Sequence, residues 1–561
     1  MKIYLYLILN IYLAFSLTLK KLNLSQEILK EDDIELIYEG NLKINSSLEF
    51  DEDYIISKIT WTKEQDYKYN YLLGVFEGSN EESFMEGIPI AIIKEKEELE
   101  DTNELEITSK NSVKYIRYIP PNKNYTDISP IKIYGYKKAI DENENNYFQA
   151  TNLPLVLIHT EKGIEPNQNG DVNCTIKLIN EGKIEISDTG KIKVRGKSTS
   201  FASQKKPYRI KFTSKQRVLN SKGKEKKWTL IANHFDRSLL RNKLAFKISE
   251  IMEFPFTPRC LPVDVILNGD FRGSYYICDK IEVGNNRINI TKMEPTDIDE
   301  PNISGGYLLQ IDSGGWGRRE QTPVPGTFKA EKGLTGKILY PEEDEITPEQ
   351  ESYIKVKINK MEDEVYNGIL DSIDLDSYCK YFIIEEFCGD PDHVWSSYYF
   401  SKDRNDDKFH FGPAWDFDLG FDNDRRLYPT SNKTEFCFHY CDSAGTMRQF
   451  VQALIDNKEV AKNVQKTWER MRETGLDEKV LLDFIEEEKK NLEESSELNI
   501  LKWDNYVENS GKGRGRGGGF GLGLGKKGEE FETSVEILKE YIQNRFNSLS
   551  KLIDNAVSSA Q

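Results

Sequence analysis

The chain has 561 residues, of which 38% are hydrophobic and 11% aromatic, and its formal net charge is −18 at pH 7. A chain of this length is too long for one small core, so the composition predicts a globular protein of two domains. The negative charge repels phosphate backbones at long range and disfavours nucleic-acid binding, although nucleotide phosphates can still bind through local lysines, arginines and a metal.

The first residues are typical of a secretory signal. A single lysine follows Met1, an apolar run extends to about Leu19, and Ala14-Phe-Ser16 offers a cleavage site near Ser16. We therefore predict a signal peptide over 1–18 and a secreted protein, located outside the cell or at the cell surface. An uncleaved anchor is the alternative. The run is short for a membrane span, and no later segment has the length of apolar sequence that a stable transmembrane span needs.

A secreted protein can form disulfides and carry N-linked glycans, so its cysteines and Asn-X-Ser/Thr sites are informative. Seven cysteines are present, so we expect some disulfides and at least one unpaired or intermolecular thiol. Cys437-Phe-His439-Tyr-Cys441 could be taken for a zinc site, but it lacks a second matching pair, which favours a disulfide or buried thiols. Seven Asn-X-Ser/Thr sites predict a glycoprotein. They are Asn23, Asn45, Asn124, Asn173, Asn289, Asn302 and Asn432.

Residues 19–148 form a first region that is dominated by strand-like runs. Tyr54–Trp61 and Val113–Tyr118 are rich in Ile, Val and aromatic residues, and polar turns separate such runs. Little of the region has a helical period, so we predict a small β-sandwich. Together, Tyr115–Pro121 and Ile131–Tyr136 loosely resemble the last strands of galactose-binding-like jelly rolls. Carbohydrate or cell-surface binding is therefore one expected role, and a structural role is the other. Asp141–Asn146 is the predicted linker.

Residues 153–558 alternate strands with helices, which predicts an α+β domain. Leu153–Ile158 is a strand-like run, and later segments space their apolar residues at the helical period. The predicted helices are 238–252, 373–388, 451–466 and about 529–555. A glycine-rich stretch at 511–527 precedes the last helix, so it predicts a flexible insert inside the domain.

The most informative segment runs from Asp392 to Asp418. Two strand-like runs, ending at 400 and spanning 408–412, flank an Asn/Asp-rich turn and predict a β-hairpin. The start of one antiparallel strand and the end of the next lie at the same end, so Asp392 should lie beside Asp416 and Asp418. Converging carboxylates at a loop suit a hard cation such as Mg²⁺.

Basic residues precede these acids. Arg195 and Gly196 lie in a turn after a strand, where backbone N–H groups and positive charge can approach an anion. An alternating run follows, in which Lys205 and Lys211 should share one face and Lys206 should lie on the other. A lysine under a basic turn is where a kinase-like enzyme holds ATP phosphates; a solvated sheet face is the alternative. Such basic strands disfavour a glycosidase, another enzyme class that uses paired carboxylates.

Asp236 and Ser238 precede the helix predicted over 238–252, and either can cap it. Together with His234 they could be mistaken for a hydrolase triad. The three residues are too close in sequence for that, and no Gly-X-Ser-X-Gly nucleophile elbow is present. Helix capping is therefore the expected role of Asp236.

Taken in order, these segments resemble the CotH kinase family, the atypical secreted or coat-associated kinases that include spore coat protein H. The resemblance covers about residues 153–555. Each motif is short, and the ordered set makes the resemblance specific. The matching stretches are Val194–Thr199, Lys205–Phe212, Trp228–Leu230, Leu240–Ala245, Gly273–Asp279, Gly305–Leu309, Asp392–Tyr399 and Pro413–Asp418.

The resemblance implies an atypical protein-kinase-like fold. Such a protein would use ATP and Mg²⁺ (or Mn²⁺) to phosphorylate Ser/Thr hydroxyls of a protein acceptor, here an extracellular or surface protein. By position, Asp392 matches the family's catalytic acid and Asp416 matches its metal-binding acid. Asp418 would assist Asp416 or only hold the loop.

The resemblance also implies how the nucleotide is held. Lys206 or Lys211 would bind the ATP phosphates, and the choice between them stays open. Arg195 and Gly196 would cover the phosphates.

Three positions depart from the family pattern. Ser397 stands where Asn often serves as a second metal ligand, and Lys197 stands where Asn is common after Arg-Gly. Asp279 replaces a frequent Glu that could pair with the phosphate-binding lysine. These departures support an alternative function, a cell-surface binding or adhesion protein on a catalytically weak kinase-like scaffold, as in some fungal relatives.

Overall fold

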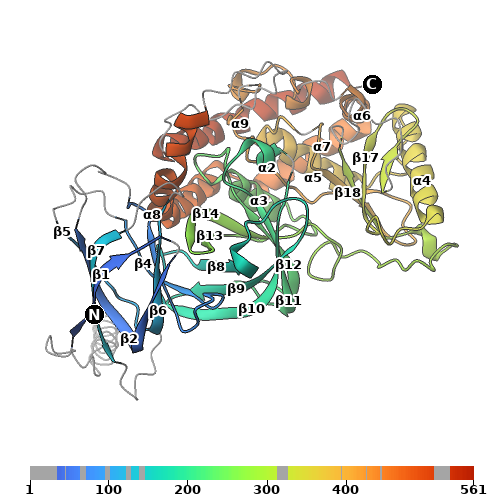
Figure 1. Ribbon diagram of the computed structural model, residues 1–561. Helices are drawn as coiled ribbons and strands as arrows, with labels where there is room; N and C mark the ends of the chain where they lie inside the picture. Colours follow the sequence, from blue (N-terminus) through green and yellow to red (C-terminus); the bar gives the residue numbers. More distant parts are fainter. Residues whose placement is uncertain are drawn as a thin grey trace, which may run out of the picture. The chain divides into compact units, whose positions relative to one another are not determined.

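The computed structural model of the chain (Figure 1) describes most of its residues. The predicted signal peptide and the glycine-rich insert lie outside the described residues. The described ranges are 34–44, 46–62, 71–94, 102–121, 128–137, 146–196, 198–312, 326–392, 394–424, 426–441, 445–510 and 531–560. The chain divides into two compact units, Met1–Phe148 and Gln149–Gln561.

The first unit is an antiparallel β-sheet. Its strands are β1 (Glu35–Leu42), β2 (Ser47–Thr62), β3 (Val75–Ser79), β4 (Ile88–Ile92), β5 (Thr102–Glu106), β6 (Ser112–Ile119) and β7 (Ile128–Lys137). They are ordered β1-β7-β2-β6-β3-β4, with β5 paired to β2. The prediction of a β-rich region is confirmed, whereas the predicted β-sandwich is not seen, because the described strands of this unit belong to one sheet. The 16-residue β2 pairs with β5, β6 and β7 and so joins all of these strands in one sheet.

The second unit begins with a closed barrel. Its strands are β8 (Leu155–Thr160), β9 (Val172–Asn180), β10 (Lys183–Val194), β11 (Tyr208–Gln216), β12 (Glu225–Ile231), β13 (Cys260–Leu267) and β14 (Asp270–Asp279). The order around the barrel is β10-β11-β12-β14-β13-β8-β9, and only β8 and β13 pair in parallel. Side chains alternate in and out along each strand, so Ile192, Ile210 and Leu230 fill the interior.

A second sheet and a set of helices complete this unit. The sheet is ordered β16-β17-β15-β18-β19, from β15 (Tyr307–Ile311), β16 (Thr327–Lys329), β17 (Thr335–Tyr340), β18 (Tyr398–Lys402) and β19 (His410–Phe411). The helices are α2 (Ser198–Ala202), α3 (Arg241–Ile251), α4 (Pro348–Tyr366), α5 (Leu375–Cys388), α6 (Gly445–Asp456), α7 (Lys458–Thr474), α8 (Glu478–Ser510) and α9 (Phe531–Ser559).

Helix α5 is the centre of the helical part. It is buried on nearly every side from Ser377 to Cys388, and its buried residues include the charged side chains of Lys380, Glu385 and Glu386. Phe387 of α5 packs against Trp468 of α7 and Phe546 of α9, with ring centroids 5.8 and 4.9 Å away. The helix ends at Gly389, whose φ of 61° is the left-handed conformation that glycine adopts without strain. This rigid helix therefore fixes where the chain emerges, just before Asp392.

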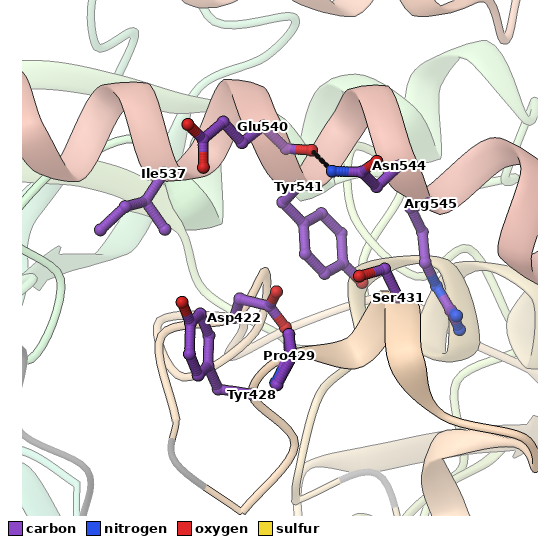
Figure 2. Close-up of a pocket in the computed structure, with 9 residues that line it drawn as sticks. All are labelled: Asp422, Tyr428, Pro429, Ser431, Ile537, Glu540, Tyr541, Asn544 and Arg545. Carbon is purple, nitrogen blue, oxygen red and sulfur yellow. Dashed lines mark hydrogen bonds between the residues drawn. The ribbon is translucent and has the colours of Figure 1, made fainter.

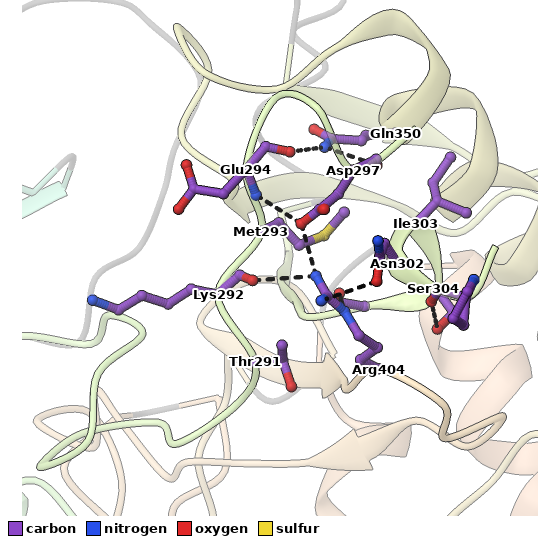
Figure 3. Close-up of polar contacts among 12 residues, drawn as sticks. Thr291, Lys292, Met293, Glu294, Asp297, Asn302, Ile303, Ser304, Gln350 and Arg404 are labelled. Atoms are coloured by element: carbon purple, nitrogen blue, oxygen red, sulfur yellow. Dashed lines mark hydrogen bonds and ion pairs between the residues drawn. The ribbon is translucent and has the colours of Figure 1, made fainter. Parts of the chain in front are cut away.

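The turn between β18 and β19 is anchored to a distant loop (Figure 3). The Arg404 guanidinium donates to the Asp297 carboxylate at 2.8 Å and to the carbonyls of Lys292 and Gly305. A Cβ at Gly305 would lie 2.2 Å from the Asp403 backbone, so only glycine fits there. The close approach explains why position 305 is a glycine. The Arg404 contacts hold the turn between β18 and β19, which is the end of the hairpin opposite Asp392 and Asp416.

The sequence predicted one helix over 451–466, and this prediction is wrong. Two helices, α6 and α7, cover the region and are separated at Asn457. The Asn457 side chain accepts the backbone N–H of Glu459 at 2.9 Å and begins α7 as its N-cap. The apolar period continues through the break, which is why periodicity alone did not locate it.

All seven cysteines are buried and unbonded in the structure. The Sγ atoms of Cys260 and Cys278 lie 2.7 Å apart, because these residues are direct partners in the β13–β14 pair. No helix among the described residues is long and apolar enough to cross a membrane.

Candidate active site around Asp392 and Asp416

The predicted β-hairpin is present, with β18 and β19 antiparallel. Asp392 lies in the turn between α5 and β18, and Asp416 lies in the segment after β19. Burial raises the pKa of the Asp392 carboxyl, the Arg426 guanidinium lowers it, and the charge of Asp416 raises it again. Two acids far apart in sequence thus act on each other electrostatically at the mouth of the hairpin.

Ser397 holds the Asp416 side chain. Its hydroxyl donates to Oδ2 of Asp416 at 2.9 Å. Both residues have left-handed backbone conformations, with φ of 59° at Ser397 and 77° at Asp416. Non-glycine residues with positive φ cost free energy and concentrate at functional sites. The surrounding fold therefore imposes this pairing against a local backbone preference.

Two buried asparagines fix the backbone around Asp416 and Asp418. The Phe417 N–H donates to Oδ1 of Asn242 on α3 at 2.8 Å. The Asn423 amide donates to the carbonyls of Phe235 at 2.8 Å and Asp418 at 2.6 Å. The acid-bearing loop is thus tied to the segment that starts α3.

Further carboxylates crowd the same site. Burial raises the pKa of Asp418 well above its usual value, and Asp416 adds to that shift. Burial likewise raises the pKa of Asp390, with a second contribution from Glu385 on α5. Glu385 is 2% exposed, and its Oε2 atom has no hydrogen-bond partner in the described part of the chain.

This set of oxygen donors fits a hard divalent cation. Mutual repulsion of Asp392, Asp416 and Asp418 would be relieved by a positive ion, and exposed Asp416 is accessible to one. Across the described ranges, no three His, Cys, Asp or Glu side chains converge as a preformed metal cage. Mg²⁺ commonly binds through one or two carboxylates and completes its shell with water and substrate phosphates. The arrangement suits that mode of binding.

Arg195 and Gly196 reach the same loop from the barrel. The Arg195 guanidinium lies over the Trp415 ring, 5.5 Å from its centroid, directly beside Asp416. Arg195 also lowers the pKa of Tyr399, which burial and Asp416 raise. Gly196 follows with φ of 82°, and its carbonyl accepts hydrogen bonds from the Gln168 and Ser200 side chains. The predicted basic turn therefore adjoins the predicted metal-binding loop.

Lys206 lies directly after this turn. Its ammonium donates to the carbonyls of Ser200 at 2.7 Å and Ser203 at 2.5 Å. An ammonium has three donors, so these two bonds leave one N–H for an anion. Lys197 lies outside the described residues.

Lys205 is buried inside the unit. It donates to the carbonyl of Ser274 and to Oδ1 of Asn499 on α8, and burial lowers its pKa to about 7. Lys211 is exposed, so the prediction that Lys205 and Lys211 share a face is wrong. Strand β11 begins only at Tyr208, so the two-residue alternation does not extend back to Lys205.

Lys211 lies on the outer face of the barrel. It is directly opposite Lys191 of β10 and Lys227 of β12. Like charges in such positions repel each other. The positive charge of Lys227 is balanced by ion pairs with Glu282 at 3.7 Å and Glu342 at 3.2 Å. Because Glu342 follows β17, this lysine row borders the side of the barrel that meets the second sheet.

Asp279 ends β14 and contacts arginines. Its carboxylate pairs with Arg287 at 3.1 Å and accepts the Arg259 N–H at 2.9 Å. Burial raises its pKa, and Arg287 opposes that shift. The contacts that the structure describes for Asp279 do not include either candidate lysine, Lys206 or Lys211.

Asp236 binds the start of α3 from outside the helix, whereas the N-cap residue is Leu240, which makes no side-chain cap hydrogen bond. The Asp236 carboxylate accepts the Ser238 hydroxyl at 2.6 Å, the backbone N–H of Arg241 at 2.8 Å, and the Arg241 guanidinium. Arg241 is the first residue of the helix. The hydrogen bonds of the Asp236 carboxylate are therefore made to residues at the start of the helix. This agrees with the rejection of a hydrolase triad.

A pocket of about 100 Å³ lies beside the segment that follows these acids (Figure 2). The loop lines one side and helix α9 the other, and none of the predicted site residues takes part. The lining residues are Asp422, Tyr428, Pro429, Ser431, Ile537, Glu540, Tyr541, Asn544 and Arg545.

A protein-family model described as CotH kinase protein matches residues 192–549, more than half of the chain. The chain belongs to the CotH kinase protein family. The match includes every predicted site residue of this CotH chain. No curated protein matches the chain.

One solved structure is also similar to part of this CotH chain. It is CBM62 from Clostridium thermocellum Xyl5A, with 21% identity over 16% of this chain and a TM-score of 0.15. The alignment spans 66% of that chain, just under two thirds. A likeness this weak carries no argument about the CotH chain.

Sequence reasoning missed several residues of this CotH site. Arg426 contacts Asp392 from a segment that has no motif of its own, and Asp424 of the same segment binds Arg426. Asn242 lies inside the family-matching stretch Leu240–Ala245. The motif therefore included this residue but did not indicate that it binds the Phe417 N–H. Asp390 is two residues before Asp392, and the Asp-Pro-Asp spacing was the available signal.

Proposed function

We propose that the protein is a secreted atypical protein kinase that transfers the γ-phosphate of ATP to Ser/Thr hydroxyls of a protein acceptor, with Mg²⁺ or Mn²⁺. Membership of the CotH kinase protein family supports a kinase or transferase activity in general. ATP supplies the phosphoryl group, and the metal ion neutralises the charge that develops on it. The nature of the acceptor and of the metal is part of the proposal.

Asp392 would orient the acceptor hydroxyl and take its proton. A carboxylate serves as a general base best when its pKa approaches the working pH. Burial and the charge of Asp416 both act on Asp392 in that direction. Its side chain is 32% exposed, so an acceptor can reach it.

Asp416 would hold the metal ion, with Asp418 next to it. The Ser397 hydroxyl fixes one Asp416 oxygen, Oδ2, at 2.9 Å and so sets the orientation of the carboxylate. Ser397 would therefore act first as an orienting group for Asp416. Its oxygen keeps lone pairs that can also reach a metal ion.

Arg195 and Gly196 would approach the ATP phosphates from the barrel side. Lys206 lies close behind this turn and keeps one N–H for a phosphate oxygen. Its position beside the turn favours it over Lys211 for direct contact. Lys211 would contribute positive charge from the outer face of β11. Asp279 would act indirectly, by holding Arg287 and the end of β14.

The geometry of the hairpin mouth carries this proposal: β18 and β19 are antiparallel, and Ser397, just before β18, donates to Asp416, just after β19, at 2.9 Å. The test is transfer of labelled γ-phosphate by full-length protein to itself and to an acidic acceptor protein, with Mg²⁺ or Mn²⁺. Phosphoserine or phosphothreonine in the product is the expected result. Asp407→Asn is a matched control, because Asp407 lies in the turn at the other end of the hairpin and is 83% exposed. Label in neither product, from folded protein that binds no nucleotide, would contradict the proposal.

A cell-surface binding or adhesion protein on a weak kinase-like scaffold is the second candidate. It is favoured by the departures from the family pattern at Ser397, Lys197 and Asp279. Binding to host cells or polysaccharide that survives Asp392→Asn and Asp416→Ala, with no phosphate transfer by wild type, would support it. Secretion and glycosylation stay predictions from the sequence in either case.

A further inference from the structure

Arg426 makes a double contact with Asp392. Its Nη1 and Nη2 atoms both lie 3.3 Å from Oδ1 of Asp392. Asp424 holds the same guanidinium from the other side, with Nε 3.0 Å from Oδ1 and Nη2 2.9 Å from Oδ2. Asp424 is fully buried and also accepts the Arg426 backbone N–H. The planar guanidinium is therefore fixed in position before it meets Asp392.

The two oxygens of Asp392 are consequently unequal. Oδ1 receives both hydrogen bonds from Arg426, and Oδ2 has no hydrogen-bond partner within the described residues. Arg426 is 23% exposed and Asp392 is 32% exposed, so the pair is only partly screened by solvent. A carboxylate with one oxygen bound and the other open is suited to accept a proton from one direction.

We propose that Arg426, held by Asp424, is a positioning residue that fixes the orientation of the Asp392 carboxylate, with Oδ1 bound to the guanidinium and Oδ2 directed to the acceptor. This inference rests on the proposed kinase function. In the transfer, the acceptor oxygen bonds to the γ-phosphorus and the bond between that phosphorus and the β–γ bridging oxygen breaks. The hydroxyl proton passes to Oδ2 of Asp392, and ADP leaves.

Other charges also face Asp392, and the test has to separate them from Arg426. Asp390 precedes it in the same turn, Asp416 and Asp418 face it from the loop after β19, and the Cys441 thiol lies on a further segment. These acidic groups disfavour the ionised carboxylate, and Arg426 opposes them. A purely structural role, in which Arg426 only ties its own segment to the turn, is the competing explanation.

Three variants separate these roles. Arg426→Met removes the charge and keeps an apolar stem. Arg426→Lys keeps the charge and loses the planar fork. Arg404→Met is the matched control, since Arg404 is 21% exposed, pairs with Asp297 at 2.8 Å and anchors the distant end of the hairpin (Figure 3).

The first readout is kcat against pH at saturating ATP and fixed Mg²⁺. We expect Arg426→Met to lower kcat about tenfold and to leave the KM for ATP within about twofold. The acid limb of the kcat profile, where activity falls as the pH is lowered, should move up by about one pH unit. Arg426→Lys should keep the acid limb near its wild-type position. An unmoved acid limb in Arg426→Met, or an equal shift in Arg404→Met, overturns the proposal.

The second readout needs no transfer activity. A ¹³C NMR titration follows the Asp392 carboxyl, identified by its loss in Asp392→Asn. A higher pKa of Asp392 in Arg426→Met supports the assignment, and an unchanged pKa overturns it. If wild type transfers no phosphate at any pH and this pKa still rises, the kinase function fails while the Arg426–Asp392 relation stands.

Discussion

The Ser397 hydroxyl donates to Oδ2 of Asp416 at 2.9 Å, and both residues have positive φ. One contact therefore joins the start of β18 to the loop after β19, the two ends of the hairpin that carry Asp392 and Asp416. Ser397, which the sequence marked as a departure from the family pattern, here orients an acid. This relationship leads to the first prediction.

Ser397→Ala should weaken metal use without unfolding the protein. The hydroxyl that fixes Asp416 is lost, so we expect the Mg²⁺ or Mn²⁺ concentration for half-maximal transfer to rise about threefold to tenfold. Ser397→Asn should keep wild-type metal dependence or improve it, because Asn tolerates positive φ and offers an amide oxygen. Metal titrations of transfer rate check both. Equal metal dependence in wild type and Ser397→Ala would contradict the assigned role.

Asn242→Ala should lower both stability and transfer. It leaves the buried Phe417 N–H without its acceptor, at a cost of about 1–3 kcal/mol in the free energy of unfolding, and loosens the loop of Asp416. Thermal unfolding and transfer rate measure the two effects. Asn111→Ala is the control, since Asn111 is buried in the first unit and bonds Ser109. Transfer should persist in that variant; if both variants lose transfer equally, the loop argument is wrong.

Gly273→Ala should be much more harmful than Gly163→Ala. Both glycines have positive φ, but a Cβ at Gly273 would lie 2.6 Å from Oδ1 of Asn499, whereas a Cβ at Gly163 meets nothing within 4 Å. Asn499 is also a partner of buried Lys205. We expect the backbone strain to lower the free energy of unfolding by about 1 kcal/mol at either site. The clash at Gly273 should lower it by at least about 2 kcal/mol more. Chemical denaturation of the two variants tests this, and equal losses would refute it.

His410 should stabilise the protein at neutral and mildly acidic pH. A hydrogen bond to Asp374 and another to Asp406 raise the pKa of His410 to about 9, although partial burial opposes the shift. The folded pKa exceeds that of an unfolded histidine, about 6.5. The contribution is therefore complete below about pH 6.5 and is lost as pH rises through about 9. His410 is 41% exposed, so solvent screens the effect.

The measurement is the melting temperature of wild type and His410→Gln as a function of pH. The difference should be largest near about pH 6 and vanish above about pH 9. His439→Gln is the control, because burial lowers the pKa of His439 and so gives the opposite sign. A difference for His410→Gln that does not depend on pH would disprove the assignment.

Cys260 and Cys278 should form a disulfide when the protein meets a disulfide oxidant. Their Sγ atoms are 2.7 Å apart on directly paired residues. With oxidised glutathione the two thiols would lose two hydrogen atoms while the oxidant is reduced. Mass spectrometry of peptides should find this link, and Cys260→Ser should remove it. Unlinked Cys260 and Cys278 after oxidation of wild type would show the prediction to be wrong.

The hairpin and the closeness of Asp392 and Asp416 could be predicted because both follow from local rules. Turn composition locates the hairpin, and antiparallel pairing brings its outer ends together. The same rules failed for Lys205, because Pro207 precedes the start of β11 and ends the alternation. A periodic pattern holds only within the element that carries it.

Long-range partners could not be predicted. Arg426 meets Asp392 across 34 residues, and Asn242 meets Phe417 across 175 residues. Neither pair has a spacing that secondary structure imposes, so no periodic pattern indicates it.

The central claim is that Asp392 and Asp416 act together in phosphate transfer. The most direct test compares initial rates of γ-phosphate transfer for wild type, Asp392→Asn, Asp416→Ala and the double variant. We predict that each single variant loses at least about 100-fold and that the double variant loses little more, because the two residues serve one step. Transfer at the wild-type rate by either single variant would contradict the account.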